Sequence, residues 1–274
     1  MPRRETLVRD VAKLKAQRLG RRYQVPEDRV EFARLLDLEP DPWQVEALRS
    51  ESPRQLYNCS RQSGKSTLSA VIGLHKALSS PNATVLLLAR ALRQSQELFT
   101  KVSQFYNKLG APIPAKSSTA LSLTLVNGSR VISLPGSTDA SIRGFSADLL
   151  IVDEGARVDD EVFHAVTPML AVTRGRMIIP STPWGRSGFF FKEWHDEQGP
   201  WERYHVTADD MILTGRITAE FIEHERRTMY GPFFKQEYYG QFVESYEQLF
   251  TEAEIQGMLD PSAKMLFPVG GEPY

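Results

Sequence analysis

Cysteine is almost absent from this sequence of 274 residues, in which Cys59 is the single example. One cysteine excludes an internal disulfide and is typical of proteins of a reducing cytoplasm, where we expect this one. The sequence also lacks the cysteine and histidine cluster of a zinc site. It has no apolar run of the roughly 18 residues that a membrane span needs, and no apolar core of a signal peptide. We therefore expect no membrane partner.

Net charge is likewise small, at −1, but the basic residues are unevenly distributed. Residues 1–25 form a basic arm in which eight arginine and lysine side chains stand against Glu5 and Asp10. The eight are Arg3, Arg4, Arg9, Lys13, Lys15, Arg18, Arg21 and Arg22. Such an arm can contact nucleic acid or an acidic neighbouring subunit, and a solvated helix face is the alternative interpretation.

The most informative segment that the sequence does contain is a phosphate-binding loop that leads into a helix. We assign eight residues of it to nucleotide binding: Ser60, Arg61, Gln62, Ser63, Gly64, Lys65, Ser66 and Thr67. Gly64 lets backbone N–H groups approach a polyphosphate, Lys65 reaches its β- and γ-phosphates, and the Ser66 hydroxyl ligates Mg²⁺. Cys59 stands where the loop consensus has its first glycine, so the loop is a variant. On these residues alone, a solvated turn with an exposed lysine is the alternative.

A second motif lies further along the chain, where the apolar run Leu149–Val152 ends in Asp153 and Glu154. Such a run is typical of a strand buried on both faces, and carboxylates at its end are costly unless they have a function. In an ATPase, Asp153 would hold Mg²⁺ through water, and Glu154 would polarise the water that attacks the γ-phosphate. A strand that ends in a helix-capping acid is the alternative. The two motifs in this order predict that the chain binds and hydrolyses ATP with Mg²⁺ as cofactor.

The order of the predicted elements indicates an α/β fold with a doubly wound, mainly parallel sheet flanked by helices. We expect strands at 56–59, 84–89, 149–152, 176–183 and 201–206, and helices at 27–38, 42–48, 68–74, 91–109, 159–170, 189–197 and 219–230. The turn Asn127-Gly128 predicts a β-hairpin insertion of strands 121–126 and 129–134. A core strand lies between the loop strand and the carboxylate strand, and Glu154 follows Asp153. These features are typical of P-loop NTPases of the catalytic-glutamate (ASCE) type rather than of small-molecule kinases or GTPases.

Four motifs in the right order resemble the large terminase subunits of tailed double-stranded-DNA bacteriophages, over roughly residues 25–250. The loop 60–66 resembles the phosphate loop of that family, which tolerates the missing glycine and favours an Arg-Gln pair. Residues 41–44 resemble its adenine-binding motif, 150–156 its carboxylate motif and 180–183 its coupling motif. The resemblance implies the ATPase domain of a motor that drives viral DNA into a procapsid, in the cytoplasm of an infected bacterium.

Four further side chains are candidates for the nucleotide site, beside the catalytic Lys65 and Glu154. Gln44 can match the N6 and N7 edge of adenine, and Trp43 could stack on the base unless it belongs to the core. By resemblance, Thr182 senses the γ-phosphate; a strand-end cap is the alternative. Arg143 is our candidate for an arginine finger that reaches the nucleotide of a neighbouring subunit. Competing arginines are Arg61, which could act within its own subunit, and Arg157, Arg174 and Arg186.

Double-stranded DNA is the expected partner, contacted through its phosphates without sequence readout. Candidate contacts are Lys101, Lys108, Lys116 and Arg130, and for each of them a solvated face is the alternative. The resemblance further implies a homo-oligomeric ring, expected to be a pentamer, with a portal and a small terminase subunit as partners.

The chain divides into the basic arm (1–25), the ATPase domain (26–248) and a linker (249–274). Large terminases of this kind carry a second, ribonuclease-H-like nuclease domain. Residues 249–274 are too few to form one, so we expect a linker toward a nuclease domain that is not present in this chain. Two other functions stay open. One is a helicase-like DNA-remodelling ATPase, which would need a second motor lobe. The other is a nucleotide-binding switch or structural subunit without hydrolysis, against which Glu154 argues.

Overall fold

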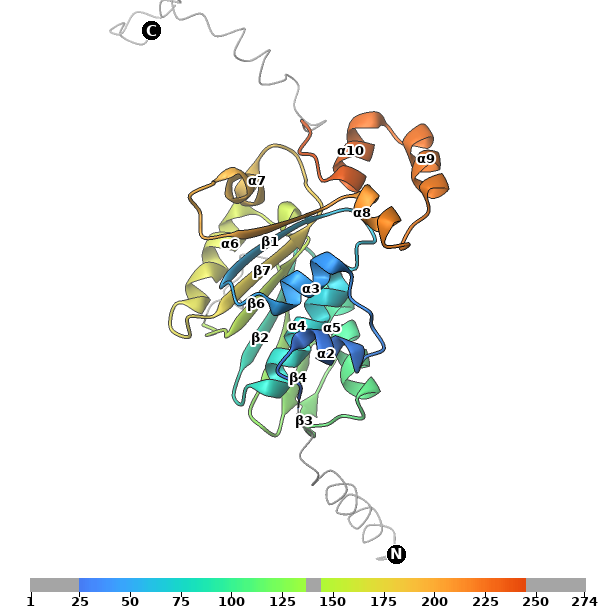
Figure 1. The fold of residues 1–274 in the computed structure, drawn as a ribbon. Coiled ribbons are helices and arrows are strands. Elements are labelled where there is room, and N and C mark those ends of the chain that lie inside the picture. The colour runs from blue at the N-terminus through green and yellow to red at the C-terminus, as the bar shows by residue number, and fades with distance from the viewer. Residues whose placement is uncertain (1–24, 137–143, 245–274) are drawn as a thin grey trace, which may run out of the picture. The chain divides into compact units, whose positions relative to one another are not determined.

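Eight strands form one sheet in the computed structural model, which describes residues 25–136 and 144–244 (Figure 1). Their order across the sheet is β3-β4-β5-β2-β6-β7-β1-β8, and the strands from β5 to β8 in this order pair in parallel. The parallel strands are β1 (Arg54–Cys59), β2 (Thr84–Ala89), β5 (Arg130–Pro135), β6 (Leu149–Asp153), β7 (Arg176–Ser181) and β8 (Glu202–Val206). At one end of the sheet, β4 (Ser122–Leu125) pairs antiparallel with β5 and with the edge strand β3 (Ala115–Ser118). The α/β, doubly wound class predicted from the sequence is confirmed.

Helices cover both faces of this sheet. One group comprises α2 (Arg29–Arg34), α3 (Pro42–Arg49), α4 (Lys65–Ser79) and α5 (Leu92–Lys108). A second comprises α6 (Asp160–Val166), the 3₁₀ helix Thr167–Leu170 and α7 (Gly188–His195). Figure 1 shows a third group together in orange: α8 (Ala208–Leu213), α9 (Ala219–Thr228) and α10 (Gly231–Tyr239). No helix within the described ranges is long and apolar enough to cross a membrane.

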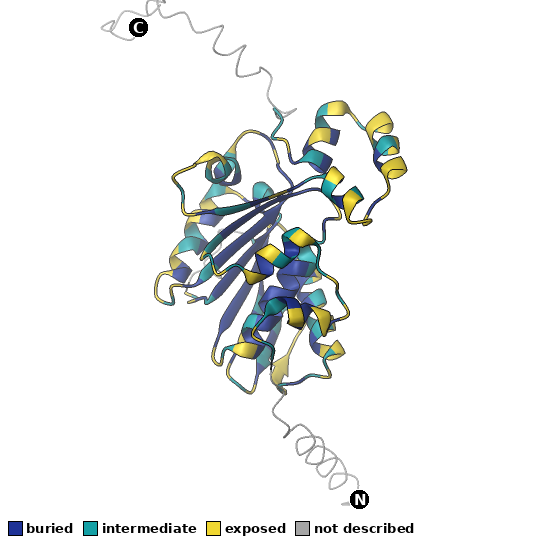
Figure 2. Ribbon diagram, in the orientation of Figure 1, coloured by how far each residue is buried: buried dark blue, intermediate teal, exposed yellow. Residues whose placement is uncertain are grey.

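Each central strand is buried on both faces, as Figure 2 shows by its dark blue strands. Alternate residues of a strand point to opposite faces, so a continuous apolar run supplies both cores. In β6, Leu149 and Ile151 join the core with α4 and α5, while Leu150 and Val152 join the core with α6 and α7. This is why β6 reads as an apolar run in the sequence and not as an alternating one.

The position of β7 decides which residues meet at the end of the sheet. It lies between the loop strand β1 and the carboxylate strand β6 and pairs in parallel with both. The carboxyl ends of parallel strands lie at one edge of a sheet, where ligands of open α/β folds bind. The residues that follow Cys59, Asp153 and Ser181 therefore meet there.

Several sequence-based boundaries differ from the structure. The predicted helix 159–170 becomes α6 and a 3₁₀ turn, because Pro168 has no backbone N–H and clashes with a continued helix. The predicted hairpin forms, but β5 pairs with β2, so it extends the main sheet rather than standing as an insertion. The short elements β3, α8 and α10 were not predicted from the sequence. The basic arm and the linker lie outside the described residues, apart from Val25 at the end of the arm.

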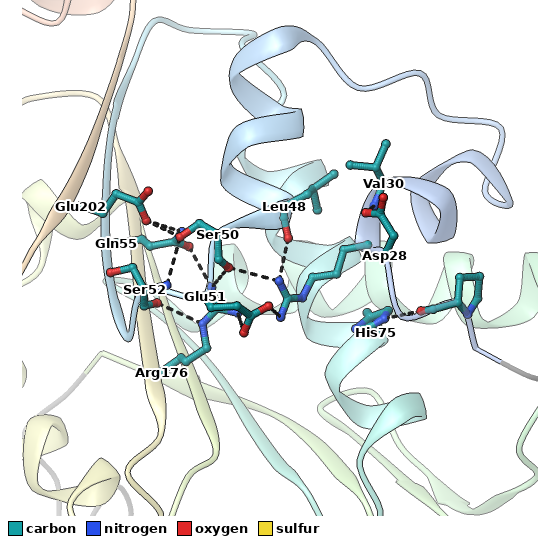
Figure 3. Close-up of polar contacts among 12 residues, drawn as sticks. Asp28, Val30, Leu48, Ser50, Glu51, Ser52, Gln55, His75, Arg176 and Glu202 are labelled. Carbon is teal, nitrogen blue, oxygen red and sulfur yellow. Dashed lines mark hydrogen bonds and ion pairs between the residues drawn. The ribbon is translucent and has the colours of Figure 1, made fainter.

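A polar network holds the N-terminal helices against the start of β1 (Figure 3). Arg29 of α2 donates to the carbonyl oxygens of Leu48 (2.7 Å) and Ser50 (3.2 Å). Arg176 at the start of β7 donates to the Ser50 carbonyl (2.9 Å), and the Ser50 hydroxyl donates to Glu202 of β8. Buried carbonyl groups need such donors. The network therefore fixes α2 and α3 on β7 and β8, the two neighbours of β1, which carries the phosphate-binding loop.

His75 is buried in the contact between α2 and α4 and provides a test of this packing. Its Nε2 lies 2.8 Å from the Pro26 carbonyl oxygen, and its ring packs edge-on against Phe32, with 5.1 Å between centroids. Burial lowers the pKa of His75, although the contact with the Pro26 carbonyl opposes this. The folded state thus takes up a proton less readily than the unfolded state.

We predict that the contribution of His75 to the free energy of unfolding is fully present above about pH 6.5, the ordinary pKa of histidine, and is lost as the pH drops below it. Urea unfolding at several pH values measures the free energy of unfolding. His75→Gln should lose less of this free energy on acidification than wild type does. The matched control is His224→Gln, at an exposed position of α9. Equal losses in His75→Gln and wild type would contradict the prediction.

Candidate functional site

The loop between β1 and α4 contains two residues in left-handed backbone conformation. Gln62 and Gly64 have positive φ angles of 59° and 85°, and Gly64 caps the N-terminus of α4. A Cβ atom on Gly64 would lie 2.7 Å from Nε2 of Gln44, so no larger residue fits without a shift. The amide of Ser60 donates to the Val206 carbonyl (2.7 Å) and that of Arg61 to the Glu237 carbonyl (2.9 Å). Two distant segments therefore support the loop from outside.

Lysine and carboxylate side chains converge where α4 begins. Nζ of Lys65 lies 3.2 Å from Oε1 of Glu154, and the Ser66 hydroxyl lies 3.4 Å from Oδ2 of Asp153. Burial, with Glu154 adding to it, raises the pKa of Asp153 to about 6. Burial lowers the pKa of Lys65, but the charges of Glu154 and Asp153 outweigh it, so the net shift is upward. The two sequence motifs thus form one site of compensating charges.

Glu154 occupies an unusual backbone position. Its φ and ψ angles of 51° and 42° are left-handed, a conformation that costs a non-glycine residue roughly 1 kcal/mol or more. The Gly155 that follows admits no side chain, because a Cβ there would lie 2.2 Å from Cγ2 of Ile179. The turn therefore directs Glu154 toward Lys65 while it packs tightly against β7.

The coupling-motif residues lie between the loop and the carboxylates, as the strand order requires. Thr182 directly follows β7 and is buried, with 3% of its surface exposed. The neighbouring Ser181 hydroxyl accepts a hydrogen bond from the amide of Ala156 (3.0 Å) and donates to the Thr182 carbonyl (2.7 Å). This segment is thus bonded directly to the turn that presents Glu154.

Gln44 lies against the phosphate-binding loop and hydrogen-bonds to three other residues. Its Nε2 donates to the Ser63 carbonyl (3.0 Å), and its Oε1 accepts from the amide of Asp41 (3.1 Å) and from Arg216 (3.1 Å). The Asp41–Gln44 pair forms the capping box of α3. Trp43 instead packs edge-on against Tyr57, with 5.9 Å between centroids, beside the core. Trp43 is thus partly buried against the core in this structure, and its stacking on the base stays a prediction.

A pocket of about 170 Å³ opens next to Gln44. Its lining includes Leu38 and Pro40 before α3, Gly64 and Thr67 at the loop, and Arg216 after α8. The pocket joins the segment that carries the predicted adenine motif to the start of α4. It combines apolar walls with a few polar groups, as small-molecule sites do.

A buried acid that the sequence analysis missed organises the arginines around the loop. Glu237 of α10 is 1% exposed and accepts from Nε of Arg61 (2.5 Å) and from Nη2 of Arg157 (3.5 Å). The Arg157 guanidinium also lies 3.8 Å from the ring centroid of Trp184. In the sequence, the one hint of this buried acid was a glutamate among the aromatic residues of 231–239. Arg143 lies outside the described residues.

The other arginine and lysine candidates lie apart from this centre. Arg174 is exposed in the turn before β7, and Arg186 donates to the Phe242 carbonyl (3.2 Å). Lys108 binds the Leu36 carbonyl (2.6 Å) and the Asp37 carboxylate (3.1 Å), so it links α5 to the turn after α2. Lys101 is half-buried on α5, Lys116 is exposed on β3, and the exposed Arg130 donates to the Thr84 hydroxyl (3.2 Å). These four DNA candidates stay predictions.

Comparison with known proteins bears on this site. The family model "Terminase large subunit, T4likevirus-type, N-terminal" matches residues 56–257. The terminase large subunit of Thermus virus P23-45 is 25% identical over 265 residues, covering 84% of this chain and 54% of that protein. The terminase large subunit of Escherichia phage T5 is 29% identical over 215 residues, covering 75% and 48%. The chain spans about half the length of the curated relatives it matches.

Solved structures agree with the fold. The ATPase domain of the Thermus phage P74-26 large terminase has a TM-score of 0.68 at 23% identity, covering 78% of this chain and 98% of that one. The large terminase of bacteriophage HK97 has a TM-score of 0.64 at 17% identity, covering 75% and 51%. The large terminase of a thermophilic bacteriophage, solved in complex with ADP, has a TM-score of 0.59 at 16% identity, covering 77% and 53%.

Cys59, which replaces the first glycine of the loop consensus, is fully buried at the end of β1. Burial raises the pKa of its thiol to about 12, so almost no reactive thiolate forms near neutral pH. We predict that the folded chain does not react with a thiol-specific reagent and that one equivalent reacts in urea. Ser118→Cys, at an exposed position of β3, should add one equivalent in the folded state. Rapid labelling of the wild-type chain without denaturant would show that this end of β1 is open.

Proposed function

The chain belongs to the terminase large subunit family, T4likevirus-type, and we propose that it is the ATP-hydrolysing domain of a viral DNA-packaging motor. The observation that carries the proposal is the pairing of Lys65 with Glu154 and of Ser66 with Asp153, directly at the start of α4. Cation, hydroxyl and two carboxylates are the groups that phosphoryl transfer from ATP to water requires. The pocket beside Gln44 adds space for a base on the same side of the loop.

In this proposal, ATP binding changes the partner of Lys65. Its side chain is 11% exposed and pairs with Glu154. A γ-phosphate at the loop would take over this ammonium group, together with backbone N–H groups at the N-terminus of α4. Glu154 would then be free to accept a hydrogen bond from the attacking water and to orient it in line with the leaving group. The buried Thr182 would then contact the γ-phosphate from the end of β7, as its resemblance to the coupling motif implies.

Mg²⁺ fits the residues present at the site. Asp153 is a carboxylate whose pKa is raised by burial and by the neighbouring Glu154, and the Ser66 hydroxyl lies beside it. Hard oxygen ligands of this kind, completed by phosphate and water, suit Mg²⁺. When bound, Mg²⁺ would neutralise charge on the phosphates; Ser66 and Asp153 are the residues that would hold it, the latter through water.

The larger assembly is part of the proposal as well. We infer that the domain works in a homo-oligomeric ring on double-stranded DNA, with a portal and a small terminase subunit, inside the infected cell. Support for the assembly comes from membership of the terminase large subunit family. Arg143 stays our candidate for a residue that acts on the nucleotide of a neighbouring subunit, while Arg61 and Arg157 are tied to Glu237 in this structure.

Glu154→Gln tests the hydrolytic function. It keeps the size of the side chain but removes the general base, so we predict ATP turnover about 10²–10⁴-fold lower, with ATP binding retained. Steady-state phosphate release measures turnover, and calorimetry measures binding. Glu161→Gln, an exposed substitution on α6, is the control and should match wild type.

Two results would contradict the function. A wild-type chain that binds ATP with no turnover, alone or with DNA, would be a nucleotide-binding switch. Full turnover in Glu154→Gln would place the catalytic base elsewhere.

Gly64→Ala tests whether the loop holds the phosphates. The new Cβ would clash with Gln44, and alanine is strained at a φ of 85°. We predict affinity for ADP lower by about tenfold or more, measured by calorimetry. Gly231→Ala at the start of α10 is the control, because a Cβ there has no described heavy atom within 4 Å. Equal affinities in the two variants would rule out the loop as the phosphate site.

A further inference from the structure

Arg216 reaches into the predicted base site from a segment far away in the sequence. It lies between α8 and α9, and its Nε pairs with the Asp41 carboxylate at the N-terminus of α3. Its Nη2 donates to Oε1 of Gln44 (3.1 Å). Arg216 also lines the pocket beside the loop, where its Nη1 lies 3.5 Å from the position of a Cβ on Gly64. One guanidinium thus contacts Asp41 and Gln44, the predicted base-reading residue, and lies beside the loop.

The hydrogen-bonding capacity of Gln44 shows what this contact does. A glutamine side chain has two N–H donors and two lone pairs on its oxygen. One donor is used by the Ser63 carbonyl, and the two lone pairs face the Asp41 amide and Arg216. One N–H donor therefore has no partner among the described residues, while the oxygen is saturated. Gln44 can bind the N7 acceptor of adenine at once, but it cannot accept from the 6-amino group without losing a partner.

The two partners of the oxygen are not equally easy to lose. The Asp41 amide belongs to the capping box of α3, so its release would unwind the helix start. Arg216 is a side chain with 32% of its surface exposed, and a freed guanidinium can remain paired with Asp41 and be hydrated. The 6-amino group of adenine is an N–H donor like Nη2 of Arg216, so it can take the same position on the oxygen.

We propose that Arg216 occupies the position on Gln44 that the 6-amino group of adenine takes, and that base binding displaces it. This rests on the proposed function, with ATP bound at this loop. Displacement lowers the apparent affinity for adenine nucleotides, because the site is partly occupied from within. It also releases the turn between α8 and α9 from Gln44 when a base is bound. A ligand with phosphates but without a 6-amino group leaves Arg216 in place.

Binding of three probes by calorimetry tests this: ADP, inosine diphosphate and inorganic tripolyphosphate. Hypoxanthine has a carbonyl where adenine has its amino group, so it cannot donate to Gln44. Arg216→Lys keeps a positive charge beside Asp41 but lacks the planar fork that reaches both residues. We expect Arg216→Lys and Arg216→Ala to bind ADP roughly three- to tenfold more tightly than wild type, the range for one hydrogen bond. Inosine diphosphate and tripolyphosphate should keep their wild-type affinities in Arg216→Lys.

The controls separate this inference from a structural role of Arg216. Arg227→Ala removes another arginine of the same region, paired with Glu223, and should bind ADP as wild type does. In a Gln44→Ala background, Arg216→Lys should no longer change ADP affinity, because the shared contact is gone. If Arg216→Ala fails to fold, the ADP affinity of Arg216→Lys by itself tests the inference.

Unchanged or weaker ADP binding in Arg216→Lys would overturn the inference, and so would equal tightening for all three probes. Failure of the proposed function gives a different pattern. In that case wild type would bind neither ADP nor tripolyphosphate.

Discussion

Parallel pairing of β1, β7 and β6 is the constraint on which the rest of the site depends. These strands end at one edge of the sheet, so the loop after β1, the turn after β6 and the segment after β7 must meet there. The ion pair between Lys65 and Glu154 and the contact between Ser66 and Asp153 follow from that register. Continuous apolar strands make the arrangement rigid, because each is packed on both faces.

Burial gives the charges at this edge their chemical character. Asp153 is buried with little compensation, and its pKa of about 6 reflects the cost of a buried anion. Lys65 stays charged because two carboxylates face it. One lysine thus faces two carboxylates, and among the described residues Asp153 makes no ion pair of its own. Divalent metal and polyphosphate are the ligands whose charges complete the site.

The segment from α8 to α10 belongs to the site as much as the loop does. Glu237 binds the loop through Arg61, both by its carboxylate and by its backbone carbonyl, and Arg216 binds the helix start that precedes the loop. Partners that lie so far apart in the sequence leave no trace in local patterns. A single buried carboxylate between two arginines is thus a tertiary feature of a short helix that sequence periodicity does not reveal.

By itself, the sequence determined the fold class and the chemical types at the site. Apolar runs that end in a glycine-containing loop, in Asp153-Glu154 or in Ser181-Thr182 can be read locally, because buried parallel strands impose them. Only the tertiary structure decided which residues each of these side chains contacts. Gln44 has the donor and acceptor that adenine requires, yet the fold binds its oxygen to Arg216. Trp43 has a stacking surface, yet the fold places it beside the core. Residue type sets what a side chain can bind, but its actual partner depends on packing between segments that only the folded chain brings together.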